Sequence, residues 1–505
     1  MKRNQDLRTS TRGPDALATA RGTPALPRAA AWAFSIAIPA ALVHLAACTV
    51  GPNYQRPKAE VPPAFKEAAP PGWKEAQPRD EIAKGNWWVV FGDPVLDGLE
   101  QQGTTANQSL KAAVERVDEA RALARVTQAQ LYPAVNADIS ASRQRVGANR
   151  SVPPGVRATS YTYNVFTLPL DLSYEIDLFG KIRRSLQASR ADYQASVAAY
   201  QTVLLTLESD LAQDYFSLRY LDADRAVLRK NIEVQQDFLD LTRKRYEGGL
   251  ASGLDVAAAE TQLDTTKALY VGDERQRQEL EHAIAVLLGR PPSEFSLPEN
   301  PLNLSPPVLP EGLPSDLLER RPDVAEAERQ MAADSARIGV ARAAYFPDLS
   351  LTASGGFLSD TLSNLLSRSS YTWFVTPLLS VPIYQGGRIR ANYQYTQAVY
   401  REAVDNYRQQ VLVAFQQVED SLSDLRVLED QGQAQGLAVQ ASQRTVNIST
   451  ARYKEGLAEY LEVLTADNSL LQNERTASQI LGMRLVSSVQ LINALGGGWA
   501  QRPVL

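Results

Sequence analysis

Hydrophobic and polar residues alternate at every second position from 166 to 178. One face carries Phe166, Leu168, Leu170, Leu172, Tyr174, Ile176 and Leu178, and most residues between them are polar. A period of two is typical of a half-buried β-strand. The segment 371–383 has the same parity. We therefore predict strands at about 161–178 and 371–383, each preceded by a weaker strand, at about 134–145 and 348–357.

Three prolines interrupt these predicted strands. Pro169, Pro377 and Pro382 each lack the backbone N–H that a sheet ladder needs. We expect bends or strand ends at these positions.

The rest of the chain has the composition of very long helices. No proline or glycine occurs between Gly180 and Tyr246, and the run 387–453 is interrupted only by two glycines. A continuous helix of this length would measure roughly 100 Å. We predict long helices ending at 246 and 453, turns at 247–253 and 454–460, and return helices at 254–288 and 461–495. Shorter helices are expected at about 93–131 and 315–345.

The sequence contains two copies of one pattern. The phrase "RYEGGLASGLDV" at 245–256 recurs as "RYKEGLAEYLEV" at 452–463, an offset of 207 residues. Before "FGKIR" at 179–183 the offset becomes 214, and we attribute the extra residues to an unequal hairpin loop. The predicted organisation is therefore repeat 1 at 93–289, a proline-rich linker at 290–314, repeat 2 at 315–499 and a tail at 500–505.

The amino terminus has the features of an export signal. Basic residues precede an apolar run that ends in "LAAC" at 45–48. This ending resembles a bacterial lipobox, so we predict a signal peptide at 1–47, lipidation of Cys48, and an extended tether at 48–92. Thr49 after the cysteine favours the outer membrane by resemblance to the bacterial sorting rule. Because the signal is long, we expect the true start codon downstream of Met1.

Composition excludes several classes of function. The formal net charge is −5, and the basic residues concentrate in the signal, so a nucleic-acid partner is not expected. Beyond residue 47 the only histidine is His282 and the only cysteine is Cys48. The usual transition-metal ligand sets and nucleophilic triads cannot be assembled from these residues. We predict no enzyme activity, no metal and no cofactor apart from the covalent lipid.

Four strands are too few to close a barrel. Open sheet edges are not tolerated in lipid, because each unpaired backbone group costs several kcal/mol. The apolar alternation is nevertheless typical of a lipid-facing strand. Other copies must complete the sheet: two copies would give eight strands, and three would give twelve with room for a conduit. The pattern therefore favours a trimeric pore.

The chain resembles the TolC-like outer-membrane factors, specifically the lipoprotein channels of tripartite efflux pumps with a resistance-nodulation-division transporter. The resemblance covers most of 48–499 and is carried by "NWWVVFGDPVLDGLE" (86–100), "YQGGRIRANY" (384–393), "LGGGW" (495–499) and the segments 319–356 and 452–471. It implies an α+β membrane protein built from two tandem repeats, which forms a homotrimeric 12-stranded β-barrel continued by an α-helical periplasmic tunnel. It also implies a periplasmic adaptor protein and an inner-membrane pump as partners, and a role in antibiotic resistance.

The two repeated turns have a structural and a functional interpretation. Gly249 and Gly456 suit left-handed helix caps, and Asp255 suits a capping box with Ser252, with the same role open to Glu462. The resemblance instead implies that the turns form a periplasmic gate. The residues that match the family's gate positions are Tyr246, Leu254, Asp255, Tyr453, Leu461 and Glu462. Thr465 departs from the family pattern, which often has an acidic residue there.

Two other functions stay open. The outer-membrane channel of a type I protein-secretion system shares the fold, although the lipobox and the "LGGGW" ending favour efflux. A lipid-anchored periplasmic scaffold would explain the helices but not the apolar alternation. The sequence does not identify the cargo, and the scarcity of methionine and histidine argues against dedicated copper or silver export.

Overall fold

The computed structural model describes most of the chain beyond the predicted signal. The described residues are 49–57, 85–151, 153, 155, 157–302, 306–307 and 321–497. They belong to one compact unit, Thr49–Leu505. Several predicted segments lie wholly or partly outside the described residues: the signal peptide, Cys48, residues 58–84 of the tether, part of the linker 290–314, residues 315–320 of the predicted helix at 315–345, and the tail 500–505.

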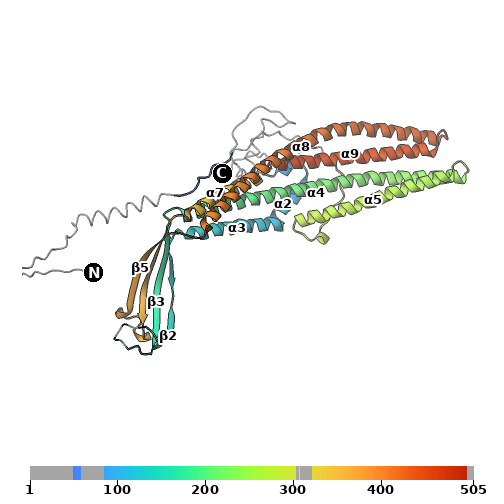
Figure 1. Ribbon diagram of the computed structural model, residues 1–505. Coiled ribbons are helices and arrows are strands. Elements are labelled where there is room, and N and C mark those ends of the chain that lie inside the picture. Colours follow the sequence, from blue (N-terminus) through green and yellow to red (C-terminus); the bar gives the residue numbers. More distant parts are fainter. Residues whose placement is uncertain are drawn as a thin grey trace, which may run out of the picture. The chain divides into compact units, whose positions relative to one another are not determined.

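The helices occur in matched pairs (Figure 1). Each pair has equal lengths and the offset expected from the repeat: α3 (Gln108–Ala129) with α7 (Pro322–Ala343), α4 (Lys181–Glu247) with α8 (Arg388–Lys454), and α5 (Gly253–Leu287) with α9 (Tyr460–Ala494). The long helices lie side by side, and the turns between α4 and α5 and between α8 and α9 are at the same end. The short helix η2 (Pro292–Glu294) follows α5.

The predicted helix at 93–131 is in fact two helices. Helix α2 (Pro94–Ala106) ends before Asn107, and α3 begins after it. The Asn107 side chain accepts a hydrogen bond from the backbone N–H of Leu110 at 2.9 Å. Asparagine competes well for backbone donors at a helix start, so it ends one helix and caps the next.

The sequence predicts an extended tether at 48–92, but the part of it directly before α2 is helical. Residues Trp87–Phe91 form a short 3₁₀ helix, η1, whose aromatic side chains are buried against α4. Phe91 contacts Phe216 with ring centroids 4.8 Å apart, and the indole N–H of Trp87 donates to Glu208 at 2.8 Å. Burial of these large side chains outweighs the weak intrinsic helical preference of the segment.

The strands form one antiparallel sheet that joins the two repeats. Its order is β1 (Ala134–Ala137) and β2 (Ser140–Val146) on one side of β3 (Tyr161–Ile176), then β4 (Asp348–Ser359) and β5 (Tyr371–Ser380). Strand β3 of repeat 1 pairs with β4 of repeat 2 from Phe166↔Ser359 to Ile176↔Leu349. The two hairpins are therefore neighbours, and β1/β2 and β5 are the edges.

Prolines explain where the strands differ from the prediction. The predicted strand at 134–145 is split into β1 and β2, although their register against β3 is continuous. The break lies opposite Pro169, which accepts a long hydrogen bond from Asp138 N–H (3.4 Å) but has no N–H to return. Strand β5 ends at Ser380, before Pro382, whereas Pro377 lies inside this edge strand.

The second strand of repeat 1 ends at Ile176 rather than at 178, because the chain turns into α4. Gly180 is the N-cap residue of that helix, with φ 83°. A Cβ on Gly180 would also lie 2.1 Å from the Thr49 side chain. The extra residues of repeat 1 are divided between the loop 147–160 and the longer strand β3, so the loop alone does not account for them.

The first described segment, 49–57, packs along the junction between sheet and helices. Val50 N–H donates to Phe179 O at 3.0 Å, at the end of repeat 1's hairpin. The hydroxyl of Tyr54 donates to Glu328 on α7, in repeat 2, at 2.5 Å. The segment therefore contacts both repeats beside the sheet.

A buried ion cluster joins the repeats midway along the long helices. Arg475 on α9 contacts Asp224 on α4 through two nitrogens, with the Nη2–Oδ2 distance 2.8 Å. Asp273 on α5 is 3.9 Å from the same guanidinium. Burial and the hydrogen bond with Asp224 raise the pKa of Asp273. Two carboxylates thus share one arginine, which holds three helices from both repeats together.

Glu100 on α2 is a second buried acid without such a partner. It is 0% exposed, and among the described residues neither carboxyl oxygen has a hydrogen-bond partner. Burial, followed by the nearby carboxylates of Glu208 and Asp97, raises its pKa from 4.5 to about 10. Glu100 is therefore protonated in the folded chain at neutral pH and ionised in the unfolded chain.

Because Glu100 is protonated in the folded chain and ionised in the unfolded chain, we predict that Glu100→Gln stabilises the protein. The wild-type fold retains a proton on Glu100 between pH 4.5 and about 10, so its stability falls as pH rises through that window, while the variant lacks this loss. Thermal unfolding followed by circular dichroism should show a stability gap that widens from about pH 5 to about pH 9, by on the order of 1 kcal/mol per pH unit.

The matched control is Glu115→Gln, which removes an exposed carboxylate on α3. Its melting temperature should stay close to that of the wild type at each pH. A Glu100→Gln gap that does not change with pH would contradict the buried, protonated state.

Candidate functional site

The two turns predicted as a gate have the same backbone. In repeat 1, Gly249 N–H donates to Tyr246 O at 2.9 Å, and Leu250 N–H donates to Arg245 O at 2.7 Å. The corresponding bonds in repeat 2 are Gly456 to Tyr453 (3.0 Å) and Leu457 to Arg452 (2.8 Å). Gly249 and Gly456 have φ of 74° and 77°, which a residue with a side chain rarely adopts. The repeated phrase thus specifies one helix-ending turn twice.

The capping box exists in repeat 1 only. Ser252 N–H donates to Asp255 Oδ2 at 2.8 Å, and Asp255 N–H donates to Ser252 Oγ at 3.2 Å. In repeat 2 the corresponding N-cap residue is Glu459, whose side chain makes no cap hydrogen bond. Glu462 lies in the first turn of α9, as predicted for a carboxylate at a helix N-terminus, but it takes part in no capping box. A short hydroxyl reaches the third backbone N–H of the helix, and the longer glutamate at 459 lacks that geometry.

The two turn tyrosines have different surroundings. Tyr453 is 4% exposed, and its ring makes an edge contact with Tyr460 at 5.8 Å. Its hydroxyl lies 3.4 Å from Thr242 Oγ1 on α4. Tyr246 of repeat 1 is 53% exposed. The reason is that repeat 1 has Gly253 where repeat 2 has Tyr460, so no second ring covers Tyr246.

Arg245 fastens the second turn to the first repeat. Its Nη1 donates to the backbone oxygen of Tyr453 at 2.7 Å, and its guanidinium stacks 4.5 Å from the centre of the Tyr453 ring. Sequence reasoning did not assign a role to Arg245 or Thr242. The only available signal was that Arg245 opens the repeated phrase.

The other predicted gate residues lie at the surface of the single chain. Leu254 and Leu461 are 77% and 62% exposed. Glu462 lies 3.8 Å from Arg452 Nη2, a contact between two half-exposed side chains that contributes little stability. Leu461, Glu462 and Thr465 line one side of a groove of about 580 Å³ between α8 and α9.

Asp467 does not occupy the place of an acidic residue at Thr465. It is 6% exposed and accepts a hydrogen bond from Gln235 Nε2 on α4 at 2.9 Å, and burial raises its pKa. Thr465 is exposed and donates to the backbone oxygen of Leu461 at 2.8 Å. The two side chains therefore point away from each other, as a separation of two helical positions requires.

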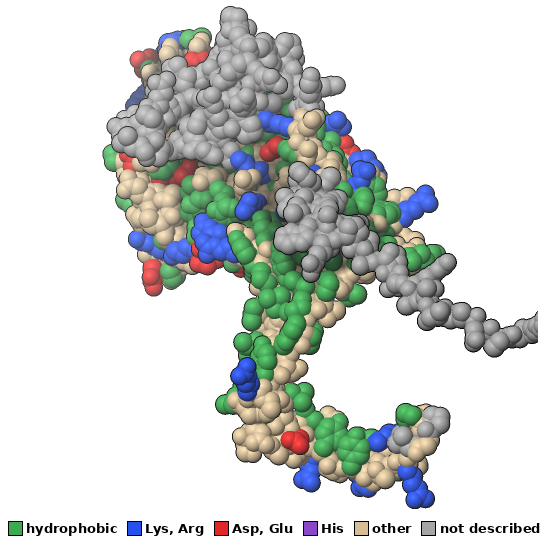
Figure 2. Space-filling view, turned by 90° about the vertical axis from the view of Figure 1, so that its left-hand side faces the viewer, with side chains coloured by type: hydrophobic (Ala, Val, Ile, Leu, Met, Phe, Trp, Pro, Cys, Tyr) green, Lys and Arg blue, Asp and Glu red, His purple; other side chains and the backbone are tan. Residues whose placement is uncertain are grey.

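The sheet exposes large apolar side chains on both of its faces. Along β5 the exposed residues include Tyr371, Trp373, Phe374, Val375, Leu378 and Leu379. Figure 2 shows hydrophobic side chains along this part of the molecule. A patch of this size needs an apolar covering, either lipid or other protein.

Within the part of the chain that the structure describes, no helix combines the length and the apolar character needed to span a membrane. The same residues contain no group of three or more histidine, cysteine, aspartate or glutamate side chains placed to hold a metal ion.

Comparison with known proteins agrees with this architecture. Residues 101–290 and 313–497 match the model of the outer membrane efflux protein family. The "Toluene efflux pump outer membrane protein TtgC" of Pseudomonas putida is 34% identical over 466 residues, 91% of this chain and 94% of the relative. The "Cation efflux system protein CusC" of Escherichia coli is 32% identical over 461 residues, 90% of this chain and 97% of the relative.

The solved structure of the outer-membrane channel OprN superposes with a TM-score of 0.81 at 30% identity. The match covers 90% of this chain and 100% of OprN. The chain belongs to the outer membrane efflux protein family. It is an outer-membrane exit duct of an efflux system, which confirms the efflux function and the location predicted from the sequence.

The difference between the two turns gives a prediction about local stability. Ser252→Ala removes the hydroxyl that accepts from Asp255 N–H, and loss of such a cap costs about 1 kcal/mol. Amide hydrogen exchange in the first turn of α5 should become roughly fivefold faster. Glu459→Ala, at the equivalent position of α9, is the matched control and should leave exchange there unchanged. Equal effects at the two sites would contradict the asymmetry.

Proposed function

We propose that three copies of the chain assemble into a 12-stranded barrel continued by a tunnel of helices. The single observation that carries this proposal is the sheet, whose edges β1/β2 and β5 are unpaired while its large apolar side chains are exposed. A sheet can enter lipid only when its edges are closed, and three copies supply enough strands for a barrel wide enough to conduct.

We further propose that this assembly passively conducts drugs or other small toxic compounds and performs no chemistry. A periplasmic adaptor protein and an inner-membrane transporter of the resistance-nodulation-division class would deliver the cargo. The relatives' names concern toluene and cation efflux, so they support an efflux pump over a type I protein-secretion system. The same names differ in cargo and therefore do not select one for this chain.

Lipidation of Cys48 is also a proposal, since this residue lies outside the described part of the chain. Its support is the "LAAC" ending and the position of the residues that follow. Thr49 packs on Gly180, and Val50 bonds Phe179, where the sheet meets the helices. A lipid on Cys48 would therefore lie directly before Thr49 and Val50, which are held where the sheet meets the helices.

One labelling and fractionation experiment tests both proposals. The wild-type protein, grown with radiolabelled palmitate, should appear in outer-membrane fractions as a labelled trimer that resists dissociation before heating. Cys48→Ser should lose the label. A labelled protein that runs as a monomer without heating would contradict the trimer, and label retained by Cys48→Ser would contradict the lipid site.

We propose that the two turns close the tunnel at its periplasmic end. In a trimer, three copies of Asp255 and Glu462 would form a ring of carboxylates, with Leu254 and Leu461 beside them. Tyr453, held by Arg245 and Thr242, would keep the turns of one chain together. The exposure of these leucines in the single chain is consistent with contacts between copies.

Single-channel recording in planar bilayers tests the ring. Asp255→Asn combined with Glu462→Gln removes six carboxylates per trimer, so block by multivalent cations should weaken and the closed state should become less frequent. Asp264→Asn, an exposed acid on the body of α5, is the control and should behave as wild type. Unchanged conductance and cation block in the double variant would exclude these residues from the gate.

A further inference from the structure

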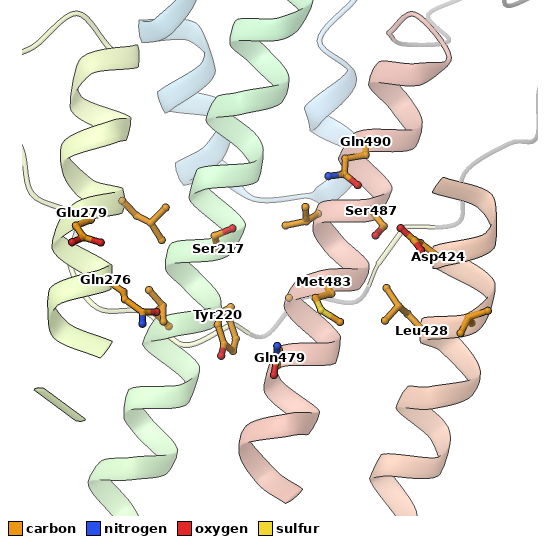
Figure 3. Close-up of a pocket in the computed structure, with 15 residues that line it drawn as sticks. Ser217, Tyr220, Gln276, Glu279, Asp424, Leu428, Gln479, Met483, Ser487 and Gln490 are labelled. Carbon is orange, nitrogen blue, oxygen red and sulfur yellow. The ribbon is translucent and has the colours of Figure 1, made fainter. Parts of the chain in front are cut away.

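A groove of about 840 Å³ crosses all four long helices on one face of the chain (Figure 3). Its lining comes from α4, α5, α8 and α9, and Figure 3 places Glu279 on α5 and Asp424 on α8, the two outermost helices. Between them the lining is largely apolar, contributed by Leu221, Leu280, Val427, Leu428, Met483 and Val486.

The close packing of α4 and α9 forms the bottom of the groove. A Cβ on Gly482 would lie 2.8 Å from Tyr220 Cβ, so only glycine allows this approach. Met483, next to it, is 39% exposed, and Val427 on α8 is 49% exposed. The single chain therefore offers an accessible apolar surface in a depression, which is typical of a site for a small apolar body.

Different positions of α4 pack against η1 and line the groove. Glu208 and Phe216 of α4 contact η1, whereas Ser217 and Leu221 line the groove. In the proposed trimer, we place the groove on the side of the helices that faces the tunnel. This step rests on the proposed function; the composition of the groove does not.

The charged side chains that line the groove are both acidic. Among the described residues that line it, Glu279 and Asp424 are the only charged side chains. Asp424 is exposed, and Asp420, one helical turn away, lines the adjoining polar pocket. Glu279 has an ion pair with Arg275 at 2.6 Å, but both side chains are more than 60% exposed, so water screens the pair.

The adjoining pocket contains one cation among the described residues that line it, and this cation does not neutralise Asp424. Arg321 is 6% exposed and is bound by Asp323 at 2.5 Å and by Gln417 at 2.7 Å. Its charge is therefore already compensated. A ligand that matches the groove needs a flat apolar body for the floor and a positive charge for the carboxylates at its edge.

We propose that the groove binds amphipathic organic cations as they pass through the tunnel. The binding is weak and reversible, because the carboxylates are solvated and the floor is open. An organic anion of similar size would meet the carboxylates unfavourably, and a neutral hydrocarbon would lack the charge contact.

The test uses the full-length protein in phosphatidylcholine nanodiscs, with ethidium as the probe. Empty nanodiscs give the background, and fluorescence titration gives the affinity. Asp424→Asn together with Glu279→Gln should weaken ethidium binding roughly tenfold, the effect of two screened charge contacts. Met483→Gln should also weaken it. Asp264→Asn, an acid outside the groove whose side chain is 74% exposed, should leave it unchanged.

The size-matched anion is 8-anilinonaphthalene-1-sulfonate, which should bind the wild type more weakly than ethidium and gain affinity in the double variant. The proposal is overturned if the wild type shows no saturable ethidium binding, as expected if a second copy of the chain fills the groove. It is also overturned if the double variant binds ethidium as well as the wild type.

Conductance of the same proteins separates this proposal from the proposed function. If the protein conducts but both substitutions leave its ethidium affinity unchanged, the result supports the duct and rejects the groove as a binding site. Binding that depends on Asp424 and Glu279 in a protein without conductance would support the groove and contradict the duct.

Discussion

The pairing of β3 with β4 is the interaction on which the rest of the structure depends. It is the point where backbone hydrogen bonds connect repeat 1 with repeat 2 along a shared strand register. Because β3 continues into α4 and α7 leads into β4, this pairing also brings α4 of repeat 1 against α7 of repeat 2. The same sheet has two unpaired edges, which neighbouring copies would close in the proposed barrel.

The two repeats share one backbone arrangement and differ in the side chains that stabilise it. The turns after α4 and α8 have the same hydrogen bonds and the same left-handed glycine. A capping box stabilises the helix after one turn, whereas aromatic packing around Tyr453 and Tyr460 stabilises the other. The second turn is held by Arg245 of the first. Separating the two turns would therefore break contacts between non-equivalent partners.

Charged residues in the helical region serve both cohesion and surface chemistry. Asp224, Asp273 and Arg475 connect the helix pairs inside the protein, where an unshared charge would be costly. Asp424 and Glu279 lie in water at the rim of an apolar groove. The same residue types thus act as internal links where they are buried and as a long-range charge pattern where they are exposed.

The sequence by itself determined the helix pairs, the strands and the repeated turns, because these follow from local periodicity and from glycine and proline positions. It did not reveal the split opposite Pro169, the burial of Glu100, the 3₁₀ helix at Trp87–Phe91 or the role of Arg245. Each of these depends on a partner far away in the chain. Local patterns indicate which face of an element is apolar, and only the tertiary structure decides what covers that face.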